Sequence, residues 1–64
     1  MTLELFSSIL MLKNKYKDVI LLFYYQEMKI REIAEILDIT EANVSMRLQR
    51  ARVLLKNLLG EDAK

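Results

Sequence analysis

Residues 30–59 have the sequence IREIAEILDITEANVSMRLQRARVLLKNLL, and this stretch determines the fold. Apolar residues recur every three or four positions over residues 30–37 and again over residues 41–59, which predicts two helices. Gly60, the only glycine in the chain, is placed to end the second of them. A short helix, a brief turn and a longer helix are the layout of a helix-turn-helix.

The turn between these helices, residues 38–40, carries the clearest local signals in the chain. Asp38 tolerates a left-handed backbone better than most residues that have a side chain. Thr40 is a good N-cap, because its hydroxyl can accept a hydrogen bond from a free backbone N–H of the next helix. Ile39 and Val44 flank this cap at the spacing of a hydrophobic staple. The turn therefore predicts a helix that starts directly after Thr40.

Two further helices are predicted upstream, over residues 2–12 and 14–26, followed by a polar connector over residues 26–29. The inner side of the second helix is predicted to carry Tyr16, Val19, Ile20, Phe23 and Tyr24. Strands are not expected, since apolar alternation never persists and the residues typical of hairpin turns are missing. The sequence predicts an all-α fold, a single four-helix domain over residues 1–64 with a C-terminal helix-turn-helix.

The composition argues against several classes of function. A chain of 64 residues buries only ~60% of the surface that it exposes when unfolded, and a hydrophobic content of 53% supplies the dense core that this requires. Cysteine and histidine are absent, which removes disulfides, thiolate metal sites and the usual general base. Glu32 and Glu35 look like paired carboxylates, but we interpret them as a solvated helix face. We expect no enzymatic activity, no metal and no cofactor.

The longest apolar run covers residues 19–25, well short of the ~20 residues needed to span a bilayer. No basic region precedes an apolar stretch at the start of the chain, so no signal peptide is predicted. We therefore expect a soluble cytoplasmic domain that has no membrane partner.

The formal net charge is only +1, but the charges are unevenly distributed. Residues 41–64 carry three acidic side chains, Glu41, Glu61 and Asp62, against five basic ones, Arg47, Arg50, Arg52, Lys56 and Lys64. Basic residues on the outer side of an amphipathic helix often serve solubility alone, and this interpretation stays open beside DNA binding.

The helix over residues 41–59 has two faces. Its inner face is predicted to carry Val44, Leu48, Ala51, Leu55 and Leu58. Towards the outer side, Arg50 can bind guanine through two hydrogen bonds, and Gln49 can bind adenine in the same way. Ser45 and Asn43 are short enough to reach either a base or a phosphate. These residues predict a face that reads the major groove.

Four cationic residues are candidates for contacts with the DNA backbone. Arg47 and Arg52 suit phosphates, and phosphate contacts fix register rather than sequence. Lys29 and Arg31, at the start of the shorter helix, can touch the backbone where that helix crosses it.

Three segments match one family: KYKDVILL over residues 15–22, IREIAEIL over residues 30–37 and VSMRLQRAR over residues 44–52. Together they resemble region 4 of the sigma-70 transcription initiation factors, particularly the extracytoplasmic-function (ECF) group, whose signature is V-[KR]-S-R-L-x-R-A-R. The resemblance implies a three-to-four-helix, winged-helix-like bundle that reads the promoter −35 element and docks on the β flap of RNA polymerase. An anti-sigma factor is a further candidate partner. The base-reading residues that it implies are Ser45, Met46, Gln49 and Arg50, with Arg47 nearer the backbone.

The chain departs from the family pattern at five positions. Met46 stands where a serine is common, and Ser45 where a lysine or arginine is common. Lys13, Glu27 and Lys29 replace a frequent proline, a frequent glycine and a frequent serine cap. The DNA sequence that this chain prefers is therefore not copied from the family.

Two other functions remain open. A stand-alone regulator of the LuxR type would dimerise, and residues 54–59 contain four leucines that could supply its interface. A protein-interaction domain would instead use Met46, Val53 and Leu54 to bind a partner without reading DNA. Nothing in the chain resembles the promoter-melting domain of complete ECF factors, so we expect either an excised C-terminal domain or a shortened protein.

Overall fold

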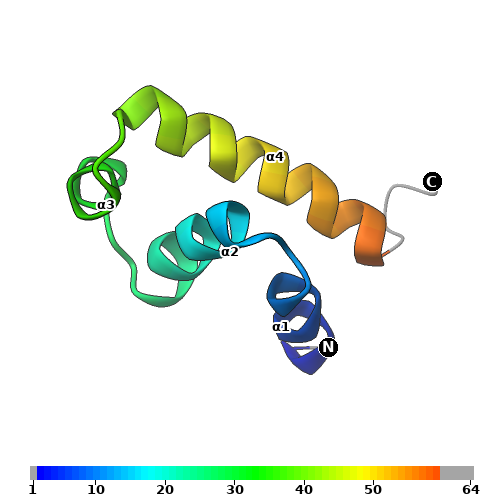
Figure 1. Cartoon of the computed structure of the whole chain (residues 1–64). Coiled ribbons are helices and arrows are strands. Elements are labelled where there is room, and N and C mark those ends of the chain that lie inside the picture. Colours follow the sequence, from blue (N-terminus) through cyan, green and yellow to red (C-terminus); the bar gives the residue numbers. More distant parts are fainter. Residues whose placement is uncertain (1, 60–64) are drawn as a thin grey trace.

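The computed structural model describes the backbone of residues 2–59 and the side chains of residues 5–59. Its elements are α1 (Thr2–Leu10), α2 (Asn14–Ile20), η1 (Leu21–Tyr25), α3 (Ile30–Leu37) and α4 (Glu41–Leu59). Figure 1 shows α4 as a long bar, with α3 near its start, α2 beside its middle and α1 towards its other end. The predicted all-α fold with a C-terminal helix-turn-helix is confirmed, and the described residues contain no strand.

The core is built around α4, which packs against α1, α2 and α3. Four of the five residues predicted for its inner face are buried, namely Val44, Leu48, Ala51 and Leu55. The prediction is wrong for Leu58, which is 46% exposed. The other helices contribute Ile9, Val19, Ile20, Ile33 and Ala34 to the same core. Because isolated helices of this length are marginal in water, this shared packing holds the four helices together.

The turn between α3 and α4 has the predicted geometry. Asp38 is left-handed, with φ 59° and ψ 46°, and the N–H of Ile39 donates to the carbonyl of Ala34 at 3.0 Å. The hydroxyl of Thr40 accepts a hydrogen bond from the backbone N–H of Asn43 at 3.0 Å, as expected of an N-cap. The predicted end of α4 at Gly60 lies outside the described residues.

Replacing Thr40 by alanine is expected to lower the free energy of unfolding by about 1 kcal/mol, because the N–H of Asn43 loses its partner. Chemical denaturation monitored by circular dichroism measures this change. Thr40→Ser, which keeps a capping hydroxyl, is the matched control and should retain most of the stability. Equal stability of the alanine and wild-type proteins would contradict a role for this cap.

Two of the departures from the family pattern, Glu27 and Lys29, lie in the connector before α3. Glu27 has φ 57°, a left-handed conformation that glycine adopts without steric cost. Lys29 occupies the N-cap of α3, and its backbone N–H donates to Oε1 of Glu32 at 2.9 Å. A lysine side chain has no acceptor for the return bond, so only this half of a capping box can form. Glu32, interpreted from sequence as a solvated face, therefore stabilises the start of α3.

The second predicted helix differs from expectation in its last turn. An α-helix ends at Ile20 and continues as one π-helical turn, η1, which closes with a bond from the N–H of Gln26 to the carbonyl of Leu21 at 3.0 Å. The placement of Tyr24 on the inner side is wrong, since this side chain is 49% exposed. A tyrosine at the edge of a core can bury part of its ring and keep its hydroxyl at the surface, where this one binds Arg52.

Among the helices over residues 2–59, none is both long enough and apolar enough to cross a membrane.

Candidate nucleic-acid interface

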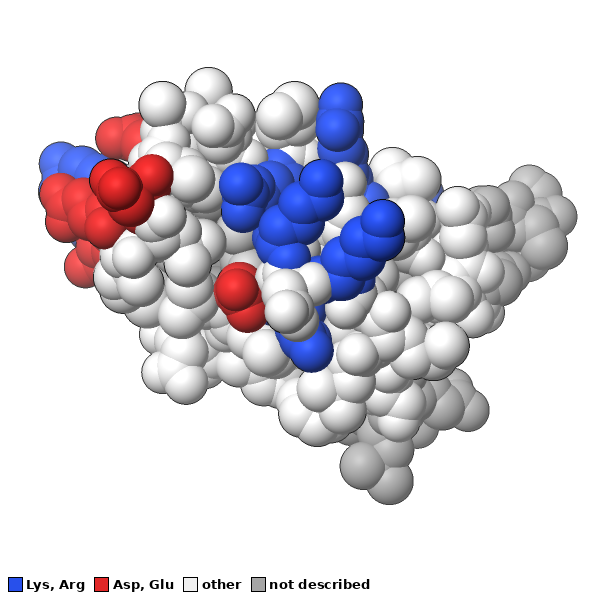
Figure 2. Space-filling view, viewed as in Figure 1, with Lys and Arg blue, Asp and Glu red and all other residues white. Residues whose placement is uncertain are grey.

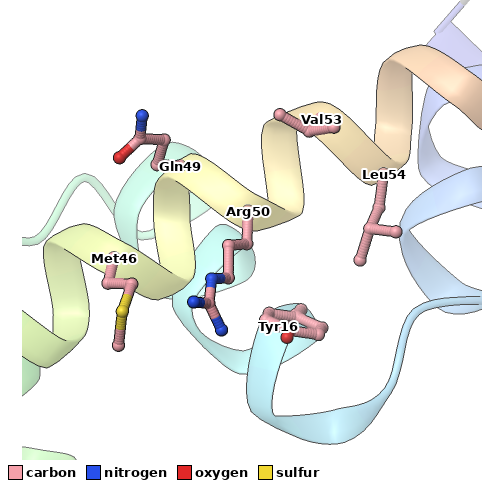
Figure 3. Close-up of a pocket in the computed structure, with 6 residues that line it drawn as sticks. All are labelled: Tyr16, Met46, Gln49, Arg50, Val53 and Leu54. Carbon is pink, nitrogen blue, oxygen red and sulfur yellow. The ribbon is translucent and has the colours of Figure 1, made fainter.

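The outer side of α4 carries a shallow hollow of about 500 Å³. Its lining residues are Tyr16, Met46, Gln49, Arg50, Val53 and Leu54 (Figure 3). Met46, Gln49 and Arg50 are three of the four predicted base-reading residues, and their spacing brings them to one side of the helix. The fourth, Ser45, is exposed and does not line this hollow.

The side chains of Arg50 and Gln49 point in different directions (Figure 3). Arg50 extends towards α2, with its guanidinium between Met46 and Tyr16, whereas Gln49 points away from α2. Tyr16 is only half-buried, so its ring forms part of the wall beside Arg50. The two polar groups best suited to bidentate contacts with bases are thus presented at separate edges of one surface.

A second, smaller hollow of about 160 Å³ lies between α2 and α4. It joins two predicted backbone-binding residues, Asn43 and Arg47, to Arg50 and to Lys15 of α2. Figure 2 shows most blue side chains gathered over α2 and α4, with one red group beside them, while most red ones lie with a blue one at the end of the molecule where α3 lies. We call Lys15, Arg47 and Arg50 the basic patch.

Lys15 is not among the residues predicted from sequence, because the helix that carries it is predicted only as a core helix. The available signal was the alternation of lysines at positions 13, 15 and 17, directly at the start of that helix. Its place beside Arg47 results from the packing of α2 along α4, which the local sequence does not specify.

The candidates on α3 lie apart from this surface. Lys29 and Arg31 are exposed, and neither of them lines the two hollows that contain Arg50. Arg31 also shares its helix with Glu32 and Glu35, so the local field there is less positive than at the basic patch. Contacts from Lys29 and Arg31 to the DNA backbone stay a prediction.

Arg52 lies on the opposite flank of α4 from the basic patch. Its Nε donates a hydrogen bond of 2.7 Å to the hydroxyl of Tyr24, and its guanidinium carbon is 5.7 Å from the centre of that ring. Because a guanidinium has five N–H donors, its terminal nitrogens retain the capacity to bind a phosphate. The structure shows that Arg52 links α4 to η1 through Tyr24. Its contact with DNA stays a prediction.

Arg52 borders a third hollow, which is apolar and measures about 530 Å³. The hollow lies between α1, the end of the second helix and the last half of α4, and its lining residues are Leu5, Ile9, Ile20, Tyr24, Tyr25, Arg52, Leu55, Lys56 and Leu59. It is therefore distinct from the surface that carries Gln49 and Arg50.

Among the described side chains, those of residues 5–59, no group of three or more His, Cys, Asp and Glu is arranged to hold a metal ion.

A family model described as Sigma-70, region 4 matches residues 2–55, which is most of the chain. No curated protein and no solved structure matches the chain. The matched range contains α1, α2, η1, α3 and the part of α4 that carries the two hollows lined by Arg50, so the candidate interface lies inside it.

Proposed function

Because the chain belongs to the sigma-70 region 4 family, we propose that its helix α4 reads the −35 element of promoters within a sigma factor of the ECF group. The family itself consists of sigma-factor domains that bind DNA in transcription and act with RNA polymerase. The proposal adds the DNA element, the subgroup and the residues that make the contacts.

One observation carries the proposal: Met46, Gln49 and Arg50 share an exposed surface on α4, and that surface is bordered by cations from two helices. The N-terminal turns of a recognition helix enter the major groove, where Arg50 would bind guanine and Gln49 adenine. Ser45, exposed on the flank of the same turns, would reach an adjoining base or phosphate.

Phosphates would be bound along the edges of this surface. The hollow at the junction of α2 and α4 is lined by Lys15, Asn43 and Arg47 beside Arg50. These three residues would bind the phosphates of a DNA strand that runs across it. Lys29, Arg31 and Arg52 remain proposed backbone contacts at greater distance from the groove-facing residues. With so few cations, the domain would bind DNA weakly at physiological salt, and tethering to polymerase would raise its effective concentration.

The apolar hollow beside Arg52 supports a second contact, with the β flap of RNA polymerase. A domain that binds DNA and polymerase together needs two surfaces, and this hollow leaves the groove-facing residues free. Its exposed members Leu5, Tyr24 and Tyr25 would be covered by an apolar segment of the partner. An anti-sigma factor would act by occupying one of these two surfaces.

The main competing function is that of a protein-interaction domain that does not read DNA, and the exposure of two apolar residues favours it. Val53 and Leu54 are 54% and 37% exposed and lie next to the proposed base-reading residues. The LuxR-type dimer has less support, because only Leu54 and Leu58 of its four leucines are exposed, whereas Leu55 is buried and Leu59 half-buried within the monomer.

The salt dependence of DNA binding tests the proposal. Affinity for a random-sequence duplex, measured by fluorescence anisotropy at several salt concentrations, should fall steeply as salt rises, since each bound phosphate releases counterions. Arg47→Ala and Lys15→Ala should each reduce the slope of log affinity against log salt by ~1.

Lys56→Ala is the matched control, because Lys56 is exposed on α4 but lines the hollow on the other flank. It should leave the slope unchanged. An equal reduction of the slope by Lys56→Ala and Arg47→Ala would show that the DNA backbone is not bound by the basic patch. Absence of DNA binding even at low salt would favour the interaction domain.

A further inference from the structure

We propose that Met46 selects a thymine, through its C5-methyl group, one or two base pairs from the pair contacted by Arg50. This inference rests on the proposed function, because it assumes that the surface of α4 faces the major groove. It adds the chemical group that this side chain recognises.

Met46 occupies the centre of the candidate interface. It lines both the hollow shared with Gln49 and the hollow shared with Arg47, and it is 42% exposed. Gln49, Arg50 and Asn43 around it all carry hydrogen-bonding groups, whereas a thioether has no donor and is only a weak acceptor. An apolar side chain therefore stands where the helix would approach the bases most closely.

The chemistry of the major groove limits what Met46 can contact favourably. Base edges present hydrogen-bond donors and acceptors there, and thymine alone among the four bases adds a methyl group. Covering a donor or acceptor with a thioether removes water without replacing its hydrogen bond, which costs free energy. Contact with the thymine methyl instead buries apolar surface on both partners, which is favourable.

The position of the thymine relative to the Arg50 contact follows from helix geometry. Met46 and Arg50 are four residues apart, which is ~6 Å along a helix axis. Successive base pairs are separated by ~3.4 Å. The sulfur end of Met46 and the guanidinium of Arg50 also extend on the same side of α4 (Figure 3). The thymine therefore lies one or two base pairs from the guanine that Arg50 would bind.

Replacing thymine by deoxyuridine tests the proposal, because the substitution removes the C5-methyl group and leaves the hydrogen-bonding edge intact. The duplex preferred by the wild-type domain is prepared with each thymine replaced in turn, and affinities are measured by fluorescence anisotropy. The guanine bound by Arg50 is the base whose preference is lost in Arg50→Ala. At one thymine position, one or two base pairs from it, the replacement should weaken wild-type binding about fourfold, because one buried methyl group is lost.

Met46→Ala should bind the thymine and deoxyuridine duplexes equally at that position, whereas Lys56→Ala, which changes a residue of α4 outside the proposed DNA surface, should keep the fourfold difference. Equal wild-type affinity for both bases at every position would overturn the assignment while leaving sequence-specific binding intact. A difference that persists in Met46→Ala would assign the methyl contact to another residue. A domain that prefers no duplex would overturn both this inference and the proposed function.

Discussion

Replacing Leu48 by alanine is expected to lower the free energy of unfolding by about 2–5 kcal/mol, enough to leave most of the domain unfolded at 25 °C. Leu48 is 2% exposed and lies in the middle of the inner face of α4, the helix against which the other three pack. A single core in a chain of this size rarely supplies more than ~3–5 kcal/mol in total. Loss of one large core side chain therefore removes most of the available stability.

Far-ultraviolet circular dichroism, followed during thermal and urea denaturation, measures this effect. Val53→Ala is the matched control, since Val53 is on the same helix but 54% exposed, and it should change the stability by less than about 0.5 kcal/mol. Retention of wild-type helicity and midpoint by Leu48→Ala would contradict the central position of α4 in the core.

Replacing Arg50 by alanine is expected to reduce affinity for the preferred duplex by about 5- to 150-fold, the range for loss of one bidentate contact with a base. Its guanidinium is exposed on the outer side of α4, between Met46 and Tyr16, and forms no hydrogen bond within the described residues that would hold it back from DNA. Affinity for a scrambled duplex should fall much less, because only one cation is lost. The ratio between the two affinities is the quantity to measure.

Arg47→Ala is the control for this loss of charge. It removes one cation from the same helix and should weaken binding to the preferred and scrambled duplexes by similar factors. An unchanged affinity ratio in Arg50→Ala would contradict base reading by Arg50. A changed ratio in Arg47→Ala would contradict its assignment to the backbone.

The helices and the turn could be predicted because their causes are local. Apolar spacing within each segment indicated the four helices, and the chemistry of Asp38 and Thr40 indicated the turn between α3 and α4. The same local rule fails at Leu58, because this residue borders a surface hollow beside the turn at residues 11–13 that joins α1 to α2, and helical spacing does not indicate which parts of α4 lie beside a turn.

Features that depend on contacts between distant segments could not be predicted. Tyr24 and Arg52 are 28 residues apart, so their hydrogen bond becomes visible only when η1 lies against α4. The approach of Lys15 to Arg47 likewise depends on how α2 packs along α4. Helical spacing alone predicts that Met46, Gln49 and Arg50 lie on one side of α4. It does not predict that Lys15 of α2 lies beside them.

We propose that this domain reads one short DNA sequence as a monomer through the outer face of α4. Selection of the domain on a pool of random duplexes at low salt, followed by sequencing of the bound fraction, tests this proposal. We expect enrichment of a single short, non-palindromic motif that contains a guanine and, one or two base pairs away, a thymine. Enrichment of a palindrome, or of no motif at any salt concentration, would contradict it.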